Sequence, residues 1–204
     1  MNIVDLNVLK GATPLPLLIL IDVQREYVES RRPLTLKNHV SAIENCRHLL
    51  QHARRSCIPV AFMRWVQPSK IFNPNGAFTT WIDGLEPLGS EMVFDRRWPS
   101  AYTSEEFAAM MDEGWGYDAA IAGFTGTIAC LATMVDASQR KHRLSFLTDA
   151  SQSHAIGSHD ESAAHTMAGS IISLFGKVES TASWINRTGV ETSKTCDRGV
   201  TRNV

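Results

Sequence analysis

Short apolar runs alternate along the chain with longer stretches in which apolar residues recur every three or four positions. The runs are Leu17–Ile21, Ile58–Phe62, Met92–Phe94, Ala119–Ala122 and Leu144–Leu147, with a sixth candidate at Lys177–Ser180. Unbroken apolarity, rather than alternation of apolar and polar positions, is typical of strands covered on both faces. We therefore expect these runs to form buried parallel strands.

The stretches between the runs have helical periodicity. The predicted helices are Val40–Ser56, Ser104–Glu113, Thr127–Lys141 and Asp160–Phe175. Strands that alternate with helices predict an α/β fold with three α-β-α layers and a central, mostly parallel, six-stranded sheet of the Rossmann-like type. In such a sheet the ligand site is expected beyond the carboxyl ends of the strands.

The length of 204 residues suits one domain, which we expect to span residues 1–185. The polar segment 186–204 has no periodicity and predicts a tail that is flexible or contacts another subunit. The segment Pro68–Ser90 is a long loop rich in proline, glycine and aromatic residues. A loop of that length in a compact domain indicates a cover over the site or an oligomer contact.

Composition excludes several classes of function. The chain has 20 Lys and Arg against 21 Asp and Glu, without the basic excess of a general nucleic-acid or anionic-membrane binder. It has no apolar run of the roughly 18 residues that span a bilayer and no signal-peptide pattern, so we expect a cytoplasmic protein. The four cysteines contain no CxxC pair; they are Cys46, Cys57, Cys130 and Cys196. That scatter disfavours a zinc site and a disulfide framework.

The first candidate for chemistry is Asp22, which follows the apolar run Leu17–Ile21. A carboxylate at the end of a buried strand is poorly solvated, which raises its pKa and suits it to proton transfer near neutral pH. The alternative is a residue that caps a helix or holds a loop. A second candidate follows another strand, where Arg96 or Arg97 holds a substrate carboxylate in a bidentate fork; the alternative is two exposed arginines paired with Asp95.

A third candidate is the segment Gly123–Thr133, in which a strand passes through a glycine-containing turn into a helix. Backbone N–H groups converge at such a turn, and those of Thr125–Ala129 are a natural site for an anion or an oxyanion. The segment contains neither GxGxxG nor GxxxxGK[ST], which disfavours a nucleotide site.

These segments, in this order and spacing, resemble the isochorismatase-like (cysteine hydrolase) family over about Leu17–Ile185. The matching motifs are Ile21-Asp22-Val23-Gln24, Arg96 to Ser100-Ala101-Tyr102, Gly123 to Ala129, Thr133 to Asp136-Ala137, and Asp149-Ala150. The resemblance implies the isochorismatase-like fold, a small-molecule substrate, a homo-oligomer (dimer or tetramer) and a catalytic triad of Asp, Lys and Cys.

This chain departs from that triad at two positions. Asp22 matches the aspartate, whereas the lysine position holds Arg96 and the nucleophile position holds Ala129. Cys130 comes one residue later, and since a helix turns about 100° per residue we expect its side chain to face away from the site and to pack as a small buried hydrophobe. Members that are true isochorismatases also have a small residue followed by cysteine at these positions.

By resemblance to those members, we expect a hydrolase without a cysteine nucleophile that acts on a small carboxylated, cyclic, vinyl-ether-type substrate. Asp22 would then be the general acid or base, and Arg96 would bind a carboxylate. The residues expected to contact substrate are Gln24, Tyr27, Trp65, Trp98, Tyr102, Phe124, Thr125, Gly126 and Cys130.

We expect no metal and no cofactor. The histidines that follow Asp149 are spaced by five and six residues, which does not place them on one helix face as ligands; they are His154, His159 and His165. We read them as surface or pocket-rim residues. Two alternatives stay open: an amidohydrolase with Cys130 as nucleophile, and a family member that binds a ligand without turning it over.

Overall fold

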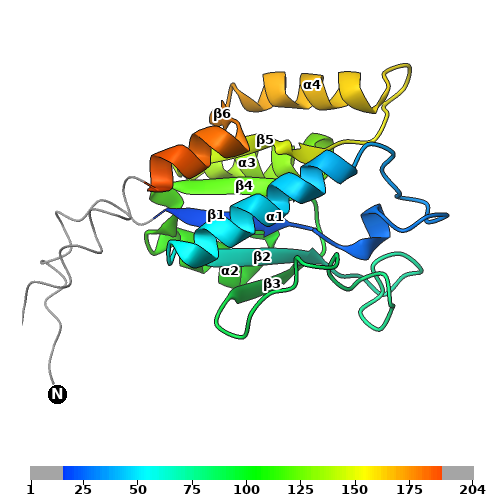
Figure 1. The fold of residues 1–204 in the computed structure, drawn as a ribbon, viewed down its shortest axis with the longest axis horizontal. Coiled ribbons are helices and arrows are strands. Elements are labelled where there is room, and N and C mark those ends of the chain that lie inside the picture. The colour runs from blue at the N-terminus through cyan, green and yellow to red at the C-terminus, as the bar shows by residue number, and fades with distance from the viewer. Residues whose placement is uncertain (1–15, 190–204) are drawn as a thin grey trace, which may run out of the picture.

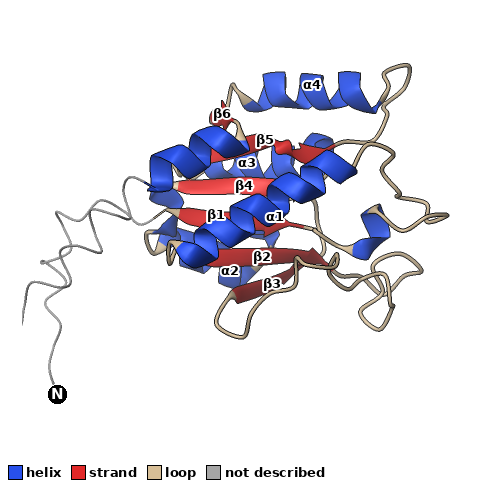
Figure 2. Ribbon diagram, in the orientation of Figure 1, coloured by secondary structure: helices blue, strands red, loops and turns tan. Residues whose placement is uncertain are grey.

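The computed structural model describes residues 16–189, which form one parallel sheet with helices on both faces. The sheet order is β3-β2-β1-β4-β5-β6 and every neighbouring pair is parallel. The strands are β1 (Leu17–Ile21), β2 (Val60–Trp65), β3 (Met92–Arg96), β4 (Ala119–Phe124), β5 (Leu144–Gln152) and β6 (Lys177–Glu179). The three-layer prediction is confirmed (Figures 1 and 2).

The helices divide between the two faces of the sheet. Longer helices are α1 (Val40–Arg55), α2 (Glu105–Asp112), α3 (Leu131–Gln139) and α4 (Glu161–Ile172), with a further one at 181–189. Short helical turns are η2 (Arg25–Tyr27), η3 (Ala101–Thr103), η4 (Trp115–Tyr117) and η5 (Gly126–Cys130). None of the helices described is long and apolar enough to cross a membrane.

The side chains of β1 point alternately into two apolar cores, one on each face of the sheet. Leu18 and Leu20 pack in a core with α1 and Trp184, whereas Leu17 and Ile19 pack in a second core with α2 and α3. Because successive side chains of a strand point to opposite faces, a strand inside such a sandwich must be apolar at every position.

Two predicted boundaries differ from the structure. The predicted helix Thr127–Lys141 is divided into a π-helical turn, η5, and the α-helix α3. The predicted tail begins too early, since residues 186–189 belong to the helix at 181–189 and residues 190–204 lie outside the described part. That helix is held by the fully buried Trp184 and by Arg187, which pairs with Asp118 and Glu179.

Candidate active site

The backbone places Asp22 at the carboxyl end of β1. Its N–H continues the strand ladder by donating to the Met63 carbonyl at 2.8 Å. The chain then turns sharply, with φ of 49° at Asp22 and a hydrogen bond from Gln24 N–H to the Asp22 carbonyl at 2.7 Å. A positive φ is strained for a residue other than glycine, and such residues concentrate at functional sites.

Arg96 ends β3 and reaches across β2 to Asp22. Its Nε donates to Asp22 Oδ1 at 3.2 Å, its Nη2 pairs with Asp22 Oδ2, and its Nη1 donates to the Trp98 carbonyl. Three of the five guanidinium N–H groups are therefore used within the chain. The expected bidentate fork on a substrate carboxylate is thus taken by Asp22, because the two side chains face each other across the sheet.

Asp95 does not pair with either following arginine. Its carboxylate accepts two hydrogen bonds from Arg64, at 2.8 and 2.9 Å, while Arg97 is exposed. The alternative of two exposed arginines paired with Asp95 is therefore wrong for Arg96, which is 1% exposed.

Burial controls the protonation of Asp22. The carboxyl is fully enclosed, and loss of solvation raises its pKa to about 6, although the charge and hydrogen bonds of Arg96 pull it downward. A carboxyl with that pKa is protonated in part of the molecules near neutral pH. Burial therefore outweighs the cationic neighbour in setting the pKa of Asp22.

The turn after β4 depends on a glycine. A Cβ on Gly123 would lie 2.0 Å from the Ile21 carbonyl oxygen, and its φ is +110°. Only glycine allows β4 to approach β1 this closely next to Asp22. The following peptide bond, Phe124–Thr125, is cis.

Fewer backbone N–H groups at this turn are available to a ligand than the sequence predicts. Thr127 N–H donates to Ser153 Oγ at 3.1 Å and Ile128 N–H donates to the Thr125 carbonyl at 3.3 Å. Two of the five N–H groups in the predicted anion pocket, Thr125–Ala129, are therefore already committed. At most three N–H groups of the predicted pocket therefore remain for an anion, because the turn satisfies part of its own backbone.

Ala129 and Cys130 are both buried on η5. The Cys130 Sγ lies 3.8 Å from the Gly123 carbonyl and 3.9 Å from Ser151 Oγ, so it contacts the carboxyl ends of β4 and β5. Burial raises the pKa of the thiol to about 12. A thiol in that environment is protonated and poorly nucleophilic.

Two polar residues hold η5 in place, and only one of them, Ser153, lies outside the motifs. Thr133 Oγ1 donates to the Ala129 carbonyl at 2.7 Å and accepts from Ala101 N–H at 3.0 Å. Ser153 Oγ lies 3.1 Å from His165 Nδ1 as well as accepting from Thr127. The sequence predicts a surface or rim position for His165, but its half-buried ring contacts Ser153 and so links α4 to η5, a contact between distant residues that their spacing in the sequence does not predict.

Aromatic rings surround the ion pair on one side. The guanidinium of Arg96 lies 4.2 Å above the ring of Trp65, which stacks on Phe72 at 5.6 Å. Tyr27 packs against Phe124 at 5.8 Å and against Phe72 at 5.4 Å. The Trp65 indole N–H is buried and has no partner among residues 16–189, which leaves an unused donor beside the ion pair.

Three of the residues expected to contact substrate make contacts within the protein instead. The Gln24 amide donates to the Trp65 and Thr79 carbonyls and accepts from Trp65 N–H, so it positions the end of β2 and has no N–H donor left for substrate. The Tyr102 hydroxyl is bonded to His142 Nδ1 at 2.8 Å, and its ring packs on Phe107, away from Asp22. Trp98 contributes its carbonyl to Arg96, while its side chain is 69% exposed.

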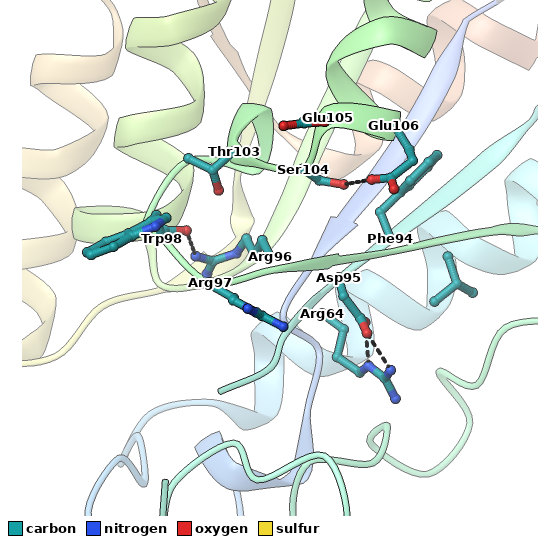
Figure 3. A pocket seen from close by; sticks show the side chains of 11 residues that line it. Arg64, Phe94, Asp95, Arg96, Arg97, Trp98, Thr103, Ser104, Glu105 and Glu106 are labelled. Carbon is teal, nitrogen blue, oxygen red and sulfur yellow. Dashed lines mark hydrogen bonds and ion pairs between the residues drawn. The ribbon is translucent and has the colours of Figure 1, made fainter. Parts of the chain in front are cut away.

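A pocket of about 860 Å³ lies along β3 and the start of α2 (Figure 3). Its lining includes Arg64, Asp95, Arg96, Arg97 and Trp98. The pocket adjoins the ion pair only through Arg96, because Asp22 is fully buried. Access of a substrate to Asp22 therefore requires movement of the side chains that cover it. No group of three or more metal-ligating side chains occurs within the described part of the chain.

Comparison with known proteins identifies one family over most of the chain. A family model described as the isochorismatase domain matches residues 16–183. The structure is similar to that of an isochorismatase from Pseudomonas putida KT2440, with 26% identity, a TM-score of 0.76, and coverage of 87% of this chain and 95% of that one. No curated protein matches the chain.

Two structures with lower sequence identity share the fold. A cysteine hydrolase from Pseudomonas syringae pv. phaseolicola 1448A has 18% identity and a TM-score of 0.77, with 86% of this chain and 93% of that chain covered. An isochorismatase-like hydrolase from Alkaliphilus metalliredigens has 17% identity and a TM-score of 0.74, with 84% and 98% covered.

Proposed function

This chain belongs to the isochorismatase family of hydrolases, and from that premise we propose that it hydrolyses a small carboxylated, vinyl-ether-type substrate without a cysteine nucleophile. The observation that carries the proposal is the buried Asp22–Arg96 pair, with Ala129 at the nucleophile position. A methyl group cannot form a thioester, so the reaction must proceed by proton transfer and water.

In the proposed reaction Asp22 donates its proton to the methylene carbon of the vinyl ether. The C=C electron pair forms the new C–H bond, and the positive charge that results is shared between the neighbouring carbon and the ether oxygen. Water adds to that carbon and returns a proton to Asp22. The hemiketal then collapses to a 2-oxo acid and an alcohol, so that one water is consumed overall.

Other groups near the pair suit this substrate. Two N–H groups of Arg96 and the indole N–H of Trp65 have no acceptor among residues 16–189 and are proposed as donors for a substrate carboxylate. Tyr27 and Phe124 offer apolar walls to a ring. The remaining N–H groups at Thr125, Gly126 and Ala129 are proposed to hold a second oxygen.

The amidohydrolase alternative needs Cys130 as a thiolate. A fully buried thiol whose pKa is raised to about 12 disfavours it.

We further propose that the protein works in the cytoplasm as a homo-oligomer. The three cysteines of the described part, Cys46, Cys57 and Cys130, are all unpaired, which agrees with a reducing compartment.

The test is to incubate the protein with isochorismate and measure pyruvate, beside a panel of amides assayed for ammonia. We expect pyruvate release that falls by at least about a hundredfold in Asp22→Asn, since a general acid contributes that much or more. Cys130→Ala is the matched control and should retain most of the activity.

Other outcomes overturn the proposal. Ammonia release that is lost in Cys130→Ala would establish the amidohydrolase instead. Isochorismate that binds in a calorimeter and is recovered unchanged would identify a binding protein. Equal pyruvate release by Asp22→Asn and the parent protein would remove Asp22 from the mechanism.

A further inference from the structure

The outer face of α4 is unusual because it is apolar or hydroxylic and carries no charge. The helix lies at the periphery of the molecule (Figure 1) and packs inward through Ala164, Ala168 and Ile172. Its exposed side chains, including the turn that ends it, are Ser162, Ala163, Thr166, Met167, Ser170, Ile171, Ser173 and Leu174. In a chain with 20% charged residues, an uncharged exposed helix face indicates an interface.

The apolar members of this face are large and accessible. Leu174 is 78% exposed, Met167 is 40% exposed and Ile171 is 37% exposed. Ile128, on the adjoining η5, is 49% exposed. Ala163, Met167, Ser170 and Leu174 follow one another at intervals of four, three and four residues, the spacing of a helix-pairing seam.

Three of the four hydroxyl groups on the face, all but that of Ser162, donate to backbone carbonyls of α4. Thr166 Oγ1 donates to the Ser162 carbonyl at 2.9 Å, and Ser170 Oγ donates to the Thr166 carbonyl at 3.1 Å. Ser173 Oγ likewise donates to the Ser170 carbonyl at 2.7 Å. A partner that covers Thr166, Ser170 and Ser173 therefore leaves these three donors paired, which lowers the cost in polar solvation of burying the face.

We propose that the occupant of this face is the α4 of a second copy of the chain, packed antiparallel across a two-fold axis. This deepens the oligomer part of the proposed function and is independent of the reaction. In an isologous contact a face meets itself, so charged residues near the axis would meet like charges, and the α4 face has none.

The order of large and small side chains along α4 also suits an antiparallel copy. When Met167 is placed opposite Ser170 of the partner subunit, Leu174 comes opposite the partner's Ala163 and Ile171 comes opposite the partner's Thr166. Each large side chain then meets a smaller one, which is the packing that well-filled helix interfaces require. A parallel pairing in register would instead place Leu174 against its own copy.

The experiment measures the mass of the full chain by light scattering or sedimentation over a range of concentrations. We expect the parent protein at twice its 22.6 kDa chain mass, and Leu174→Lys at the monomer mass. Val93→Lys is the matched control, because Val93 is 44% exposed on β3, at the opposite edge of the sheet from β5 and β6, on which α4 packs, and this variant should remain dimeric. A parent tetramer that Leu174→Lys converts to a dimer also supports the interface.

A compensating pair tests the antiparallel register. Adding Ala163→Glu to Leu174→Lys places a carboxylate opposite an ammonium twice across the axis, so the double variant should regain the dimer mass. A double variant that stays monomeric would overturn the register. A parent protein that is monomeric at every concentration would overturn both the interface and the homo-oligomer. A Leu174→Lys variant that is as dimeric as the parent would overturn this interface alone. Neither result bears on pyruvate release.

Discussion

Asp22 combines two effects that act against each other. Burial favours its neutral form, and the guanidinium of Arg96 favours its charged form, with burial the larger of the two. Arginine at the position that the family resemblance assigns to lysine is therefore compatible with the proposed role of Asp22 as an acid. A guanidinium cannot give up a proton near neutral pH, so the proposed reaction assigns the mobile proton to Asp22 and the fixed positive charge to Arg96.

The pH dependence of turnover tests this assignment. Because the protonated form of Asp22 is the donor, kcat should be highest below its pKa of about 6 and fall roughly tenfold per pH unit above it. Initial rates of pyruvate release from about pH 5 to 9 measure the profile. Cys130→Ala should keep the same profile, and a rate that instead rises through pH 6 would make Asp22 a base.

Alkylation separates the two roles proposed for Cys130. Cys57 is exposed, whereas Cys130 is buried with its pKa raised to about 12, so iodoacetamide should modify Cys57 quickly and Cys130 only as the protein unfolds. Peptide mass spectrometry of timed samples at neutral pH measures both rates, and buried Cys46 serves as the internal control. Cys130 reacting ahead of Cys57 in the native protein would favour the amidohydrolase.

At the scale of elements, the site is made by three strand ends that the chain visits far apart in sequence. β1 brings Asp22, β3 brings Arg96, and the turn from β4 into η5 brings Ala129. The close contact of β4 with β1 at Gly123 brings that turn next to Asp22. The geometry of the site and the stability of the sheet therefore depend on the same glycine.

Gly123→Ala should be strongly destabilising. The new methyl would clash with the Ile21 carbonyl at 2.0 Å and would occupy a positive φ, which together cost about 3 kcal/mol or more of the free energy of unfolding. Urea unfolding followed by circular dichroism measures the change. Gly89→Ala is the control, since a Cβ there meets nothing within 4 Å, and an equal effect of the two substitutions would contradict this account.

At the scale of the whole molecule, the candidate active site is closed while one peripheral helix is uncovered. Asp22, Arg96 and Ala129 are each at most 1% exposed, yet Leu174 at the end of α4 is 78% exposed. His165 on α4 contacts Ser153, which holds η5, so α4 connects the proposed subunit contact to the turn that carries Ala129.

Thermal stability should report the subunit contact. Because a dimer is favoured by mass action, the melting temperature of the parent protein should rise with protein concentration, whereas that of Leu174→Lys should not. Differential scanning calorimetry at several concentrations makes the comparison, with Val93→Lys expected to behave like the parent. A parent melting temperature that does not change with concentration would argue against a dimer.

The sequence alone determined the α/β class, the order of strands and helices, and Asp22, Arg96 and Ala129 as the positions to compare. These follow from local rules, since buried parallel strands must be apolar throughout and a motif keeps its spacing along the chain. The helix at 181–189 escaped prediction because its docking depends on distant partners, Asp118 and Glu179, for Arg187.

Only the tertiary structure decided what each side chain is free to do. It showed that the Asp22 carboxylate is bound by the guanidinium of Arg96, that the Gln24 side-chain amide is hydrogen-bonded to the backbone of Trp65, and that the Tyr102 hydroxyl is bonded to His142. A hydrogen-bonding group has a limited number of partners, and residues far apart in sequence compete for them. That competition, like the raised pKa of Asp22, depends on enclosure by the whole fold and on no pattern along the chain.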